Sequence, residues 1–379
     1  MPDVSRTPGH QQWPERSQED WRVEATGLTT WVAAVLRSLE VQPAHAASAA
    51  RVLVAADLQG TDSHGVARLP AYVERLRRGT MAVDGQPQVV SDRGATALID
   101  GGNLMGHAVA ELGMTEAVAR ARVHGVGWVA VRGSNHFGIA GYYARLAAED
   151  GFVGLCGTNA GARVAPAGAS RPFLGTNPFA FAAPTARPPV LVVDMATSAV
   201  ATGKLELALR SGQAVPEGWV VDAAGRHTTD PQSLAHGGWL LPLGSFAHLS
   251  AHKGYALGLV VEVLSALLAG GPYGPGVGNL VFTAGEGPAR VGHFFGAIDP
   301  ARFGSAHAFA ATVASLMDDL RALPATDPRQ PVRTPGEPEW RCEQERRAHG
   351  IPLAGTVRRA LSRTADDLSV PLPALARRW

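Results

Sequence analysis

The sequence predicts an α/β fold with much parallel strand pairing. Short apolar segments typical of strands alternate along the chain with longer segments whose apolar residues recur at helical spacing. The chain has 379 residues, of which 46% are hydrophobic and 18% are charged. It is therefore long enough for two domains and can bury a substantial core.

The expected elements follow one another from the first helix to the C-terminal segment. Helical periodicity predicts helices at residues 28–40, 43–58, 106–124, 139–149, 197–210, 252–268 and 306–323. Apolar or alternating segments predict strands within residues 86–100 and at 127–131, 152–157, 189–195 and 293–298. We expect a disordered leader at residues 1–25, a proline-rich surface connection at 324–338, and partly helical structure at 339–379.

Composition argues against several classes of protein. The net charge is +1 and no basic stripe is present, so we expect no nucleic-acid partner. Cys156 and Cys342 are far apart, which argues against a disulfide framework and a structural zinc site. The N-terminus lacks a secretory signal pattern, and the longest apolar run, residues 255–269, is interrupted by Glu262 and Ser265. We therefore expect a cytoplasmic protein without a membrane span.

The most informative stretch of the chain, residues 62–68, reads DSHGVAR. Residues four apart lie on one helix face, so a helix over this stretch would align His64, Arg68 and Tyr72. Pro70 would strain such a helix and favours instead a helix that begins at the proline. In either case His64 and Arg68 stay close together in the chain.

This pair of side chains suits a small 2-oxo or 2-hydroxy acid. Arg68 would bind the carboxylate through the planar fork of its guanidinium. His64 would exchange a proton with the neighbouring oxygen near neutral pH. The alternative from these residues alone is a capping serine, Ser63, at the start of a solvated polar face.

Three further segments place polar residues where strands and helices meet. In SNHFG, His136 could contact a phosphate or a nicotinamide, or could be satisfied by the backbone. In VDMATS, Asp194 could accept from ribose hydroxyls, orient a catalytic histidine or cap the following helix. In HKGY, Lys253 could meet a phosphate or a carboxylate, or could be a solvated lysine; the chain has only one other lysine, Lys204.

Standard nucleotide and hydrolase motifs are absent from the sequence. No G-x-G-x-x-G follows a strand, and Gly203-Lys204 is followed by leucine rather than by the serine or threonine of a P-loop. G-x-S-x-G, H-E-x-x-H and the kinase signatures are also missing. The residues alone therefore predict an α/β enzyme with histidine, arginine and lysine in glycine-rich loops, and no particular cofactor.

Six segments, in this order, resemble the malate/L-lactate dehydrogenase family. They read DSHGVAR at 62–68, SNHFGIAGYY at 134–143, LGTNP at 174–178, DMATS at 194–198, HKGY at 252–255 and GHFF at 292–295. The resemblance extends from about residue 28 to about residue 347. It implies an NAD(P)-dependent oxidoreductase that transfers hydride between nicotinamide and a 2-oxo or 2-hydroxy acid of the malate or L-lactate type.

The resemblance also implies an architecture. We expect a malate/L-lactate dehydrogenase-like fold, a mixed sheet with flanking helices, and an NAD(P)-binding domain that is not of the Rossmann type. Residues 26–105 together with 300–379 would form a helical and substrate domain, and residues 106–299 the central NAD(P)-binding domain. The protein would be a homodimer that uses NAD or NADP and no metal.

The same resemblance assigns roles to individual residues. His64 would be the acid/base, Ser63 would orient it, and Arg68 would bind the substrate carboxylate. His136 is the second candidate for the acid/base and would also lie against the cofactor. The other residues expected to contact the cofactor are Gly138, Thr158, Thr176, Asp194, Met195, Ala196, Lys253 and His293.

Residues 161–163 depart from the family pattern, because they read GAR where relatives often have Ser-Pro. The change removes a serine and adds Arg163, a second cation that would suit a diacid or a sulfonate if it points into the site. Ureidoglycolate or sulfolactate dehydrogenase, or a reductase of a cyclic imine acid such as piperideine-2-carboxylate, are alternatives on the same fold. From other classes, a non-catalytic binding protein remains, as does a metal hydrolase using His64, His136, Asp194 and His252.

Overall fold

The computed structural model describes residues 21–210, 212–280 and 287–377. Residues 1–20 of the expected leader lie outside the described residues. The remainder of that segment is not a leader, because Trp21–Val23 form strand β1 and helix α1 (Ala25–Arg37) follows directly. The helix begins there since the Glu24 carboxylate accepts two backbone N–H groups of its first turn.

A seven-stranded mixed sheet lies at the centre of the molecule, in the order β2-β3-β4-β11-β5-β6-β7. Its strands are β2 (Gln88–Arg93), β3 (Thr96–Asp100), β4 (Val126–Ser134), β5 (Val153–Thr158), β6 (Phe179–Ala183), β7 (Leu191–Met195) and β11 (Val291–Ile298). The sequence missed β6 and placed the other six. A mixed sheet with flanking helices confirms that part of the expected fold class.

The expectation of much parallel pairing is wrong. In this sheet only β3 and β4 pair in parallel, and every other neighbouring pair is antiparallel. β4 and β5 do run in the same direction, as their connection through a helix predicts. However, β11 comes from much later in the chain and lies between them, antiparallel to both.

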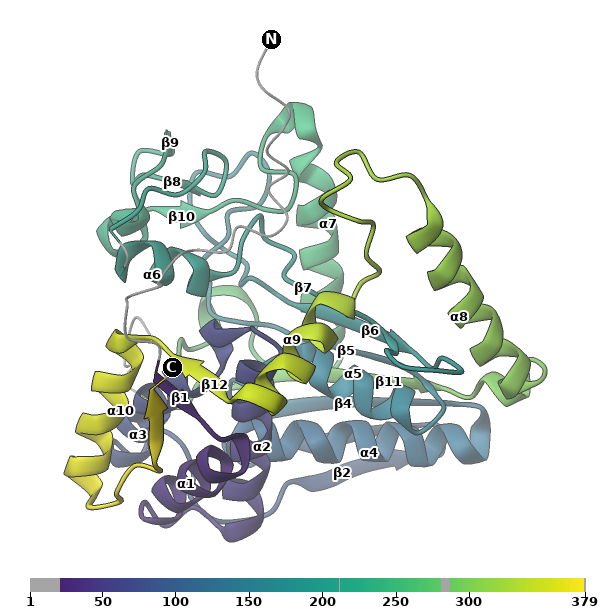
Figure 1. Cartoon of the computed structure of the whole chain (residues 1–379), viewed down its shortest axis with the longest axis horizontal. Coiled ribbons are helices and arrows are strands. Elements are labelled where there is room, and N and C mark those ends of the chain that lie inside the picture. The colour runs from purple at the N-terminus through teal and green to yellow at the C-terminus, as the bar shows by residue number, and fades with distance from the viewer. Residues whose placement is uncertain (1–20, 211, 281–286, 378–379) are drawn as a thin grey trace.

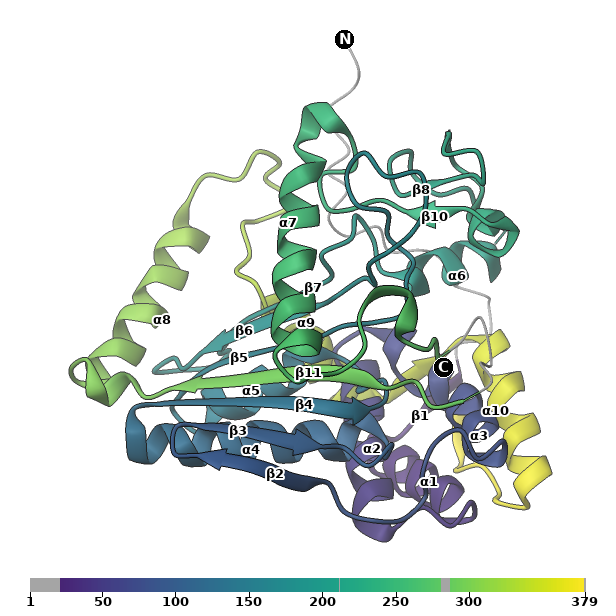
Figure 2. The ribbon, with the colours of Figure 1, turned by 180° about the vertical axis from the view of Figure 1, so that it is seen from behind.

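Helical segments cover both faces of this sheet (Figures 1 and 2). On one face lie α4 (Gly106–His124) and α5 (Ala140–Glu149). On the other, a π-helical turn, Val263–Leu267, follows α7 (Ala251–Glu262) and contacts β11. The turn lies so close that a Cβ on Gly292 of β11 would overlap the backbone carbonyl of Ser265.

The two ends of the chain build one helical unit beside the sheet, the outer unit (Figure 1). Its apolar core is shared by α1, α2 (Pro43–Leu58), α3 (Leu69–Arg77), β12 (Ile351–Leu353) and α10 (Gly355–Leu368). β1 pairs with β12 on one side and with β13 (Leu375–Arg377) on the other. α9 (Glu337–His349) leads into this unit and contacts α2.

The expected domain boundaries differ from this arrangement at two places. β2 and β3 belong to the large sheet, although the sequence assigns residues 26–105 to the outer domain. α8 (Ala306–Ala322) hydrogen-bonds the segment between β6 and β7, where the Ala186 N–H donates to the Ala310 carbonyl. We therefore propose an outer domain of residues 21–87 and 337–377, and a central domain of residues 88–210, 212–280 and 287–336.

A smaller apolar core joins α6 (Thr202–Arg210) to the short strands β8 (Val220–Val221) and β10 (Trp239–Leu240). β8 also pairs with β9 (His227–Thr228). The expected helix at 197–210 begins only at Thr202, because the Ala199 N–H donates to the Leu241 carbonyl and the chain before α6 is extended. None of the helices in the described part of the chain is long and apolar enough to cross a membrane.

Candidate active site

The stretch that carries His64 forms two short 3₁₀ turns, Asp62–His64 and Val66–Arg68, rather than one helix. α3 begins directly afterwards at Leu69, with Pro70 in its first turn. Proline is tolerated there because its φ is already helical and its missing N–H would have no partner. The interpretation in which the proline marks the start of the helix is confirmed.

A buried carboxylate holds this stretch in place. Asp57, at the end of α2, is 3% exposed, and its Oδ2 accepts the backbone N–H of Val66 at 2.9 Å. Burial raises the pKa of this carboxyl well above its usual value, while the Val66 N–H acts in the opposite direction. From the other side, Arg346 of α9 donates to the backbone carbonyl of Asp57 and to the carboxylate of Asp62. The C-terminal part of the chain therefore fixes the loop of the candidate acid/base.

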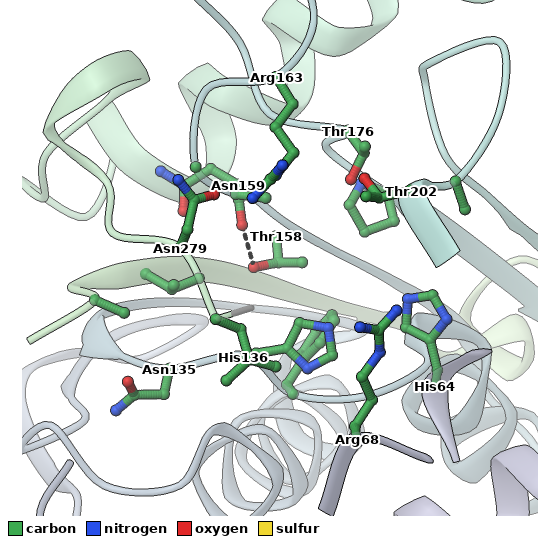
Figure 3. A pocket seen from close by; sticks show the side chains of 18 of the residues that line it. His64, Arg68, Asn135, His136, Thr158, Asn159, Arg163, Thr176, Thr202 and Asn279 are labelled. Atoms are coloured by element: carbon green, nitrogen blue, oxygen red, sulfur yellow. Dashed lines mark hydrogen bonds between the residues drawn. The ribbon is translucent and has the colours of Figure 1, made fainter. Parts of the chain in front are cut away.

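His64 and Arg68 line a cavity of about 130 Å³ between the outer unit and the sheet (Figure 3). Arg68 and Arg163 extend into it from opposite sides, and His136 lies beside Arg68. The remaining polar side chains of its wall are Asn135, Thr158, Asn159, Thr176, Thr202, Glu206 and Asn279. Its small size and the polar and charged side chains in its wall suit an organic acid of a few carbon atoms.

His64 is held by two neighbours. Its Nδ1 lies 2.9 Å from the Ser63 hydroxyl oxygen, and its ring stacks on that of His136 with 5.7 Å between centroids. The surrounding protein keeps water away from the His64 ring, and this desolvation lowers its pKa to about 3. The positive charge of Arg68 lowers the pKa further. At neutral pH the imidazole is therefore uncharged, and an anion bound at Arg68 would raise its pKa.

Arg68 is oriented by two acceptors. Its Nε donates to the Ser63 carbonyl at 2.6 Å, and its Nη1 pairs with Oε2 of Glu206 at 2.9 Å. The first turn of α6 packs tightly against the loop that carries Ser63, since a Cβ on Gly203 would lie 2.5 Å from the Ser63 Cβ. That close approach brings Glu206, one turn further along α6, to the guanidinium.

Arg163 is the second cation of the cavity. Burial lowers the pKa of its guanidinium to about 10; the Glu206 carboxylate opposes this shift and the Arg68 cation adds to it. The lining therefore contains two guanidinium groups and one carboxylate, together with the uncharged His64 and His136. An excess of positive charge in a small, partly buried space favours an anionic ligand.

A groove of about 1060 Å³ meets this cavity. His64, Gly138, Thr176, Pro178 and Ala201 line both spaces. Further along, the wall of the groove includes the expected cofactor residues Asp194, Met195 and Ala196, the first turn of α5, and Lys204.

The groove fits a dinucleotide in size and in chemistry. Backbone N–H groups at a helix N-terminus favour a phosphate, and α5 begins at Ala140 in the wall of the groove. Gly138, just before it, has φ +82°, and a Cβ there would lie 2.7 Å from Val52. Glycine is therefore required at this position, where the wall of the groove packs against α2. Asp194 is directed to the same helix start, where its Oδ2 accepts the Gly141 N–H at 2.7 Å.

Three expected cofactor residues stand apart from these. Lys253 is exposed on the first turn of α7 and lines neither the cavity nor the groove. His293 is fully buried, with Nδ1 2.7 Å from the Thr158 Oγ1 and Nε2 2.8 Å from the Ser134 Oγ. Thr158 does line the cavity, but its hydroxyl donates to the Gly292 carbonyl. Cofactor contacts by these three residues stay predictions.

Sequence reasoning missed Glu206, Asn279 and His107. Glu206 lies in an amphipathic helix, where a charged residue normally faces solvent, and Asn279 lies in a glycine-rich loop. His107 is fully buried in the first turn of α4 and contacts the hydroxyl of Tyr72. None of the three belongs to a short motif, so only the packing of distant segments reveals them.

The metal-hydrolase alternative is not supported by the arrangement of its proposed ligands. Within the described ranges, no group of three or more His, Cys, Asp or Glu side chains could hold a metal ion. His252 is exposed on α7, whereas His64 lies at the cavity. The geometry therefore favours the acid-binding interpretation of His64 and Arg68.

Comparisons with known proteins agree with this arrangement. A family model described as malate/L-lactate dehydrogenase matches residues 23–362. A malate dehydrogenase from Pyrococcus horikoshii is 38% identical over 350 residues, which cover 92% of this chain and 96% of the relative. A (2R)-3-sulfolactate dehydrogenase (NADP(+)) from Chromohalobacter salexigens is 36% identical over 325 residues, 86% of this chain and 88% of the relative. The crystal structure of malate dehydrogenase from Entamoeba histolytica matches with a TM-score of 0.89 at 32% identity, over 93% of this chain and 99% of that one.

Proposed function

The chain belongs to the malate/L-lactate dehydrogenase family and is an NAD(P)-dependent oxidoreductase of 2-hydroxy acids; we propose that the cavity and the groove together form its active site. One observation carries this proposal. His64 lines both the small cavity and the larger groove, and Arg68 lines the same cavity. An acid in the cavity and a nicotinamide at the near end of the groove would therefore meet at His64.

Different residues of the cavity bind the acid and exchange its proton. Arg68 binds the 2-carboxylate, and its orientation by Ser63 and Glu206 reduces the entropy lost when the acid binds. NAD(P)H, when bound, supplies hydride to the 2-carbon, and NAD(P)⁺ accepts it in the reverse direction. His64 exchanges the proton with the 2-oxygen, while the Ser63 hydroxyl stays at Nδ1.

The low pKa of His64 in the free site favours oxidation, and binding of the acid shifts this pKa toward the value that reduction needs. In oxidation, the uncharged imidazole takes the proton of the substrate hydroxyl. In reduction, it must carry a proton, which the low pKa of the free site disfavours. The substrate carboxylate offsets the Arg68 charge, so binding of the acid raises the pKa of His64 toward the range in which it donates.

For the substrate, we propose a 2-hydroxy acid with a second anionic group, a carboxylate or a sulfonate. Arg163 lies across the cavity from Arg68 and provides a second guanidinium for that group. Relatives named malate dehydrogenase and sulfolactate dehydrogenase support this substrate class. The Glu206 carboxylate pairs with Arg68 and acts electrostatically on Arg163, so it would repel the second anion.

The groove residues would hold the cofactor. The backbone N–H groups at the start of α5 that Asp194 does not occupy would face its phosphates, and the other oxygen of Asp194 would accept from a ribose hydroxyl. Lys204 is exposed along the same wall and would add a positive charge for the pyrophosphate. The choice between NAD and NADP is open to direct measurement.

The decisive experiment follows absorbance of the reduced nicotinamide with purified protein. NADH and NADPH are offered separately with oxaloacetate, sulfopyruvate, pyruvate, diketogulonate and piperideine-2-carboxylate. We expect oxidation with oxaloacetate or sulfopyruvate and slower turnover with pyruvate. Turnover of the cyclic imine alone would replace the proposal with an imine reductase, and cofactor binding without any turnover would contradict it.

We also propose that the enzyme is a cytoplasmic homodimer that pairs through α7. The apolar side chains that α7 and its π-helical turn leave exposed are Leu257 (47%), Leu259 (43%), Val260 (53%), Val263 (42%) and Leu267 (49%). A helix this apolar and this exposed on a folded chain favours burial against a partner. Analytical ultracentrifugation should give twice the chain mass, and Val260→Asp should shift the protein toward the monomer.

A further inference from the structure

Beyond the acid-binding pair, a buried tyrosine contacts the second histidine of the cavity. Tyr72 is on the first turn of α3 and is fully buried. Its hydroxyl oxygen lies 2.6 Å from Nδ1 of His136 and 3.4 Å from Nε2 of His107. Neither Tyr72 nor His107 takes part in the proposed hydride and proton transfer.

Nδ1 of His136 has a second contact, which indicates whether this nitrogen carries a proton. The backbone N–H of Gly138 points at the same nitrogen at 3.3 Å. An amide N–H can only donate, so this long contact favours a lone pair rather than a proton on Nδ1. In the uncharged imidazole, the ring proton of His136 is then on Nε2.

The tyrosine hydroxyl reinforces this assignment. Burial raises the pKa of Tyr72 above its usual value, so the hydroxyl keeps its proton at all physiological pH values. Since Nδ1 of His136 offers a lone pair at 2.6 Å, the hydroxyl donates there. The oxygen of Tyr72 is left as an acceptor, and Nε2 of His107 is the neighbour that can donate to it.

The neighbours of His136 keep it uncharged. Burial lowers its pKa well below the usual value, and His64, His107, Arg68 and His293 lower it further electrostatically. In the described part of the chain, its Nε2 makes no hydrogen bond that would compete with a ligand, and the residue lines the cavity. Figure 3 shows its ring beside the Arg68 guanidinium.

We propose that Tyr72 is a positioning residue that fixes His136 with its ring proton on Nε2, so that His136 offers the bound acid a hydrogen-bond donor. In this arrangement Nε2 of His107 donates to the Tyr72 hydroxyl, the hydroxyl donates to Nδ1 of His136, and Nε2 of His136 is left to donate into the cavity. His136 thus binds, and His64 alone exchanges the proton with the substrate oxygen. This last consequence rests on the proposed function, whereas the tautomer itself does not.

The test reads the tautomer directly, without turnover. Protein labelled with ¹⁵N-histidine is observed by NMR, and the signals of His136 among the 13 histidines are assigned by their loss in His136→Gln. We expect an unprotonated Nδ1 and a protonated Nε2 in the wild-type protein, unchanged between pH 6 and 9. In Tyr72→Phe, only the long Gly138 contact remains, so a mixture of both tautomers should appear.

Tyr143→Phe is the matched control. Tyr143 is equally buried, and its hydroxyl donates to the backbone carbonyl of Phe137 at 2.5 Å, in the same loop as His136. Both variants lose one buried hydrogen bond, and both should unfold at a lower temperature. Only Tyr72→Phe should change the nitrogen signals of His136, because only Tyr72 touches the imidazole.

Kinetics provide the second readout. In Tyr72→Phe we expect KM for the acid to rise about fivefold, the effect of weakening one hydrogen bond, with a smaller change in kcat. Wild-type His136 with its proton on Nδ1, or titrating between pH 6 and 9, would overturn the proposal even if Tyr72→Phe does not fold. Unchanged nitrogen signals in a folded Tyr72→Phe would overturn it too. If no acid is turned over at all, the proposed function fails while the tautomer measurement still decides this inference.

Discussion

At the residue scale, His64 is the side chain on which the proposed chemistry depends. Replacing it with alanine removes the proton exchange but leaves the groove, so His64→Ala should lower kcat about 100-fold or more and leave NAD(P)H affinity unchanged. Stopped-flow turnover and a fluorescence titration of the reduced cofactor measure the two quantities. The control is His252→Ala, on the exposed start of α7. Normal turnover in His64→Ala would transfer the acid/base role to another group.

Arg163 supports a prediction about substrate charge. If it binds the second anionic group, Arg163→Gln should lower kcat/KM for oxaloacetate about tenfold and change that for pyruvate little, because pyruvate has no such group. Arg171→Gln is the matched control, since Arg171 is an exposed arginine outside both cavity and groove. Equal losses on both acids would mean that Arg163 only shapes the cavity.

At the scale of elements, we predict that the contact between α9 and the loop of His64 holds this loop in place for catalysis. Arg346 bridges the backbone carbonyl of Asp57 and the carboxylate of Asp62. Arg346→Ala should therefore loosen residues 62–66, which would appear as faster hydrogen exchange there and as a several-fold loss of kcat/KM.

The neighbouring arginine provides the comparison. Arg347 is on the same helix, but its side chain is 55% exposed and pairs with Glu343 rather than with the loop. Arg347→Ala should leave both hydrogen exchange at residues 62–66 and turnover close to wild type. If the two variants behave alike, α9 acts through overall stability and not through the loop.

On the scale of the whole molecule, buried histidines make stability depend on pH. His107 and His293 are fully buried, and burial lowers the pKa of each to about 3 from 6.5. Between these values the unfolded chain binds protons that the folded chain does not, so stability is lost as the pH falls below about 6.5.

A single substitution isolates one of these sites. His293→Asn removes one titrating group, so its free energy of unfolding should fall less than that of the wild type between pH 7.5 and 5, by roughly 2 kcal/mol. Urea unfolding at the two pH values measures the difference. His124→Asn, at an exposed histidine, should leave the pH dependence unchanged. An identical pH dependence in His293→Asn and wild type would show that folding does not lower the pKa of His293.

The sequence by itself determined the kinds of elements, most of their positions, the family, and the pairing of His64 with Arg68. α2 and α4 lie at the predicted bounds because periodic burial and turn residues are properties of a short window of chain. His64, Arg68 and His136 could be named for the same reason, since each is in a short motif whose chemistry is local.

Only the tertiary structure decided which side chains from distant parts of the chain contact these residues. β11 lies between β4 and β5, Glu206 meets Arg68 across 138 positions of sequence, and Tyr72 meets His136 across 64. Such contacts depend on how whole elements pack, and no window of sequence contains both partners. The charge of the cavity and the tautomer of its second histidine are consequences of that packing. The sequence could therefore predict an acid-binding enzyme, but not the charge or the protonation of its site.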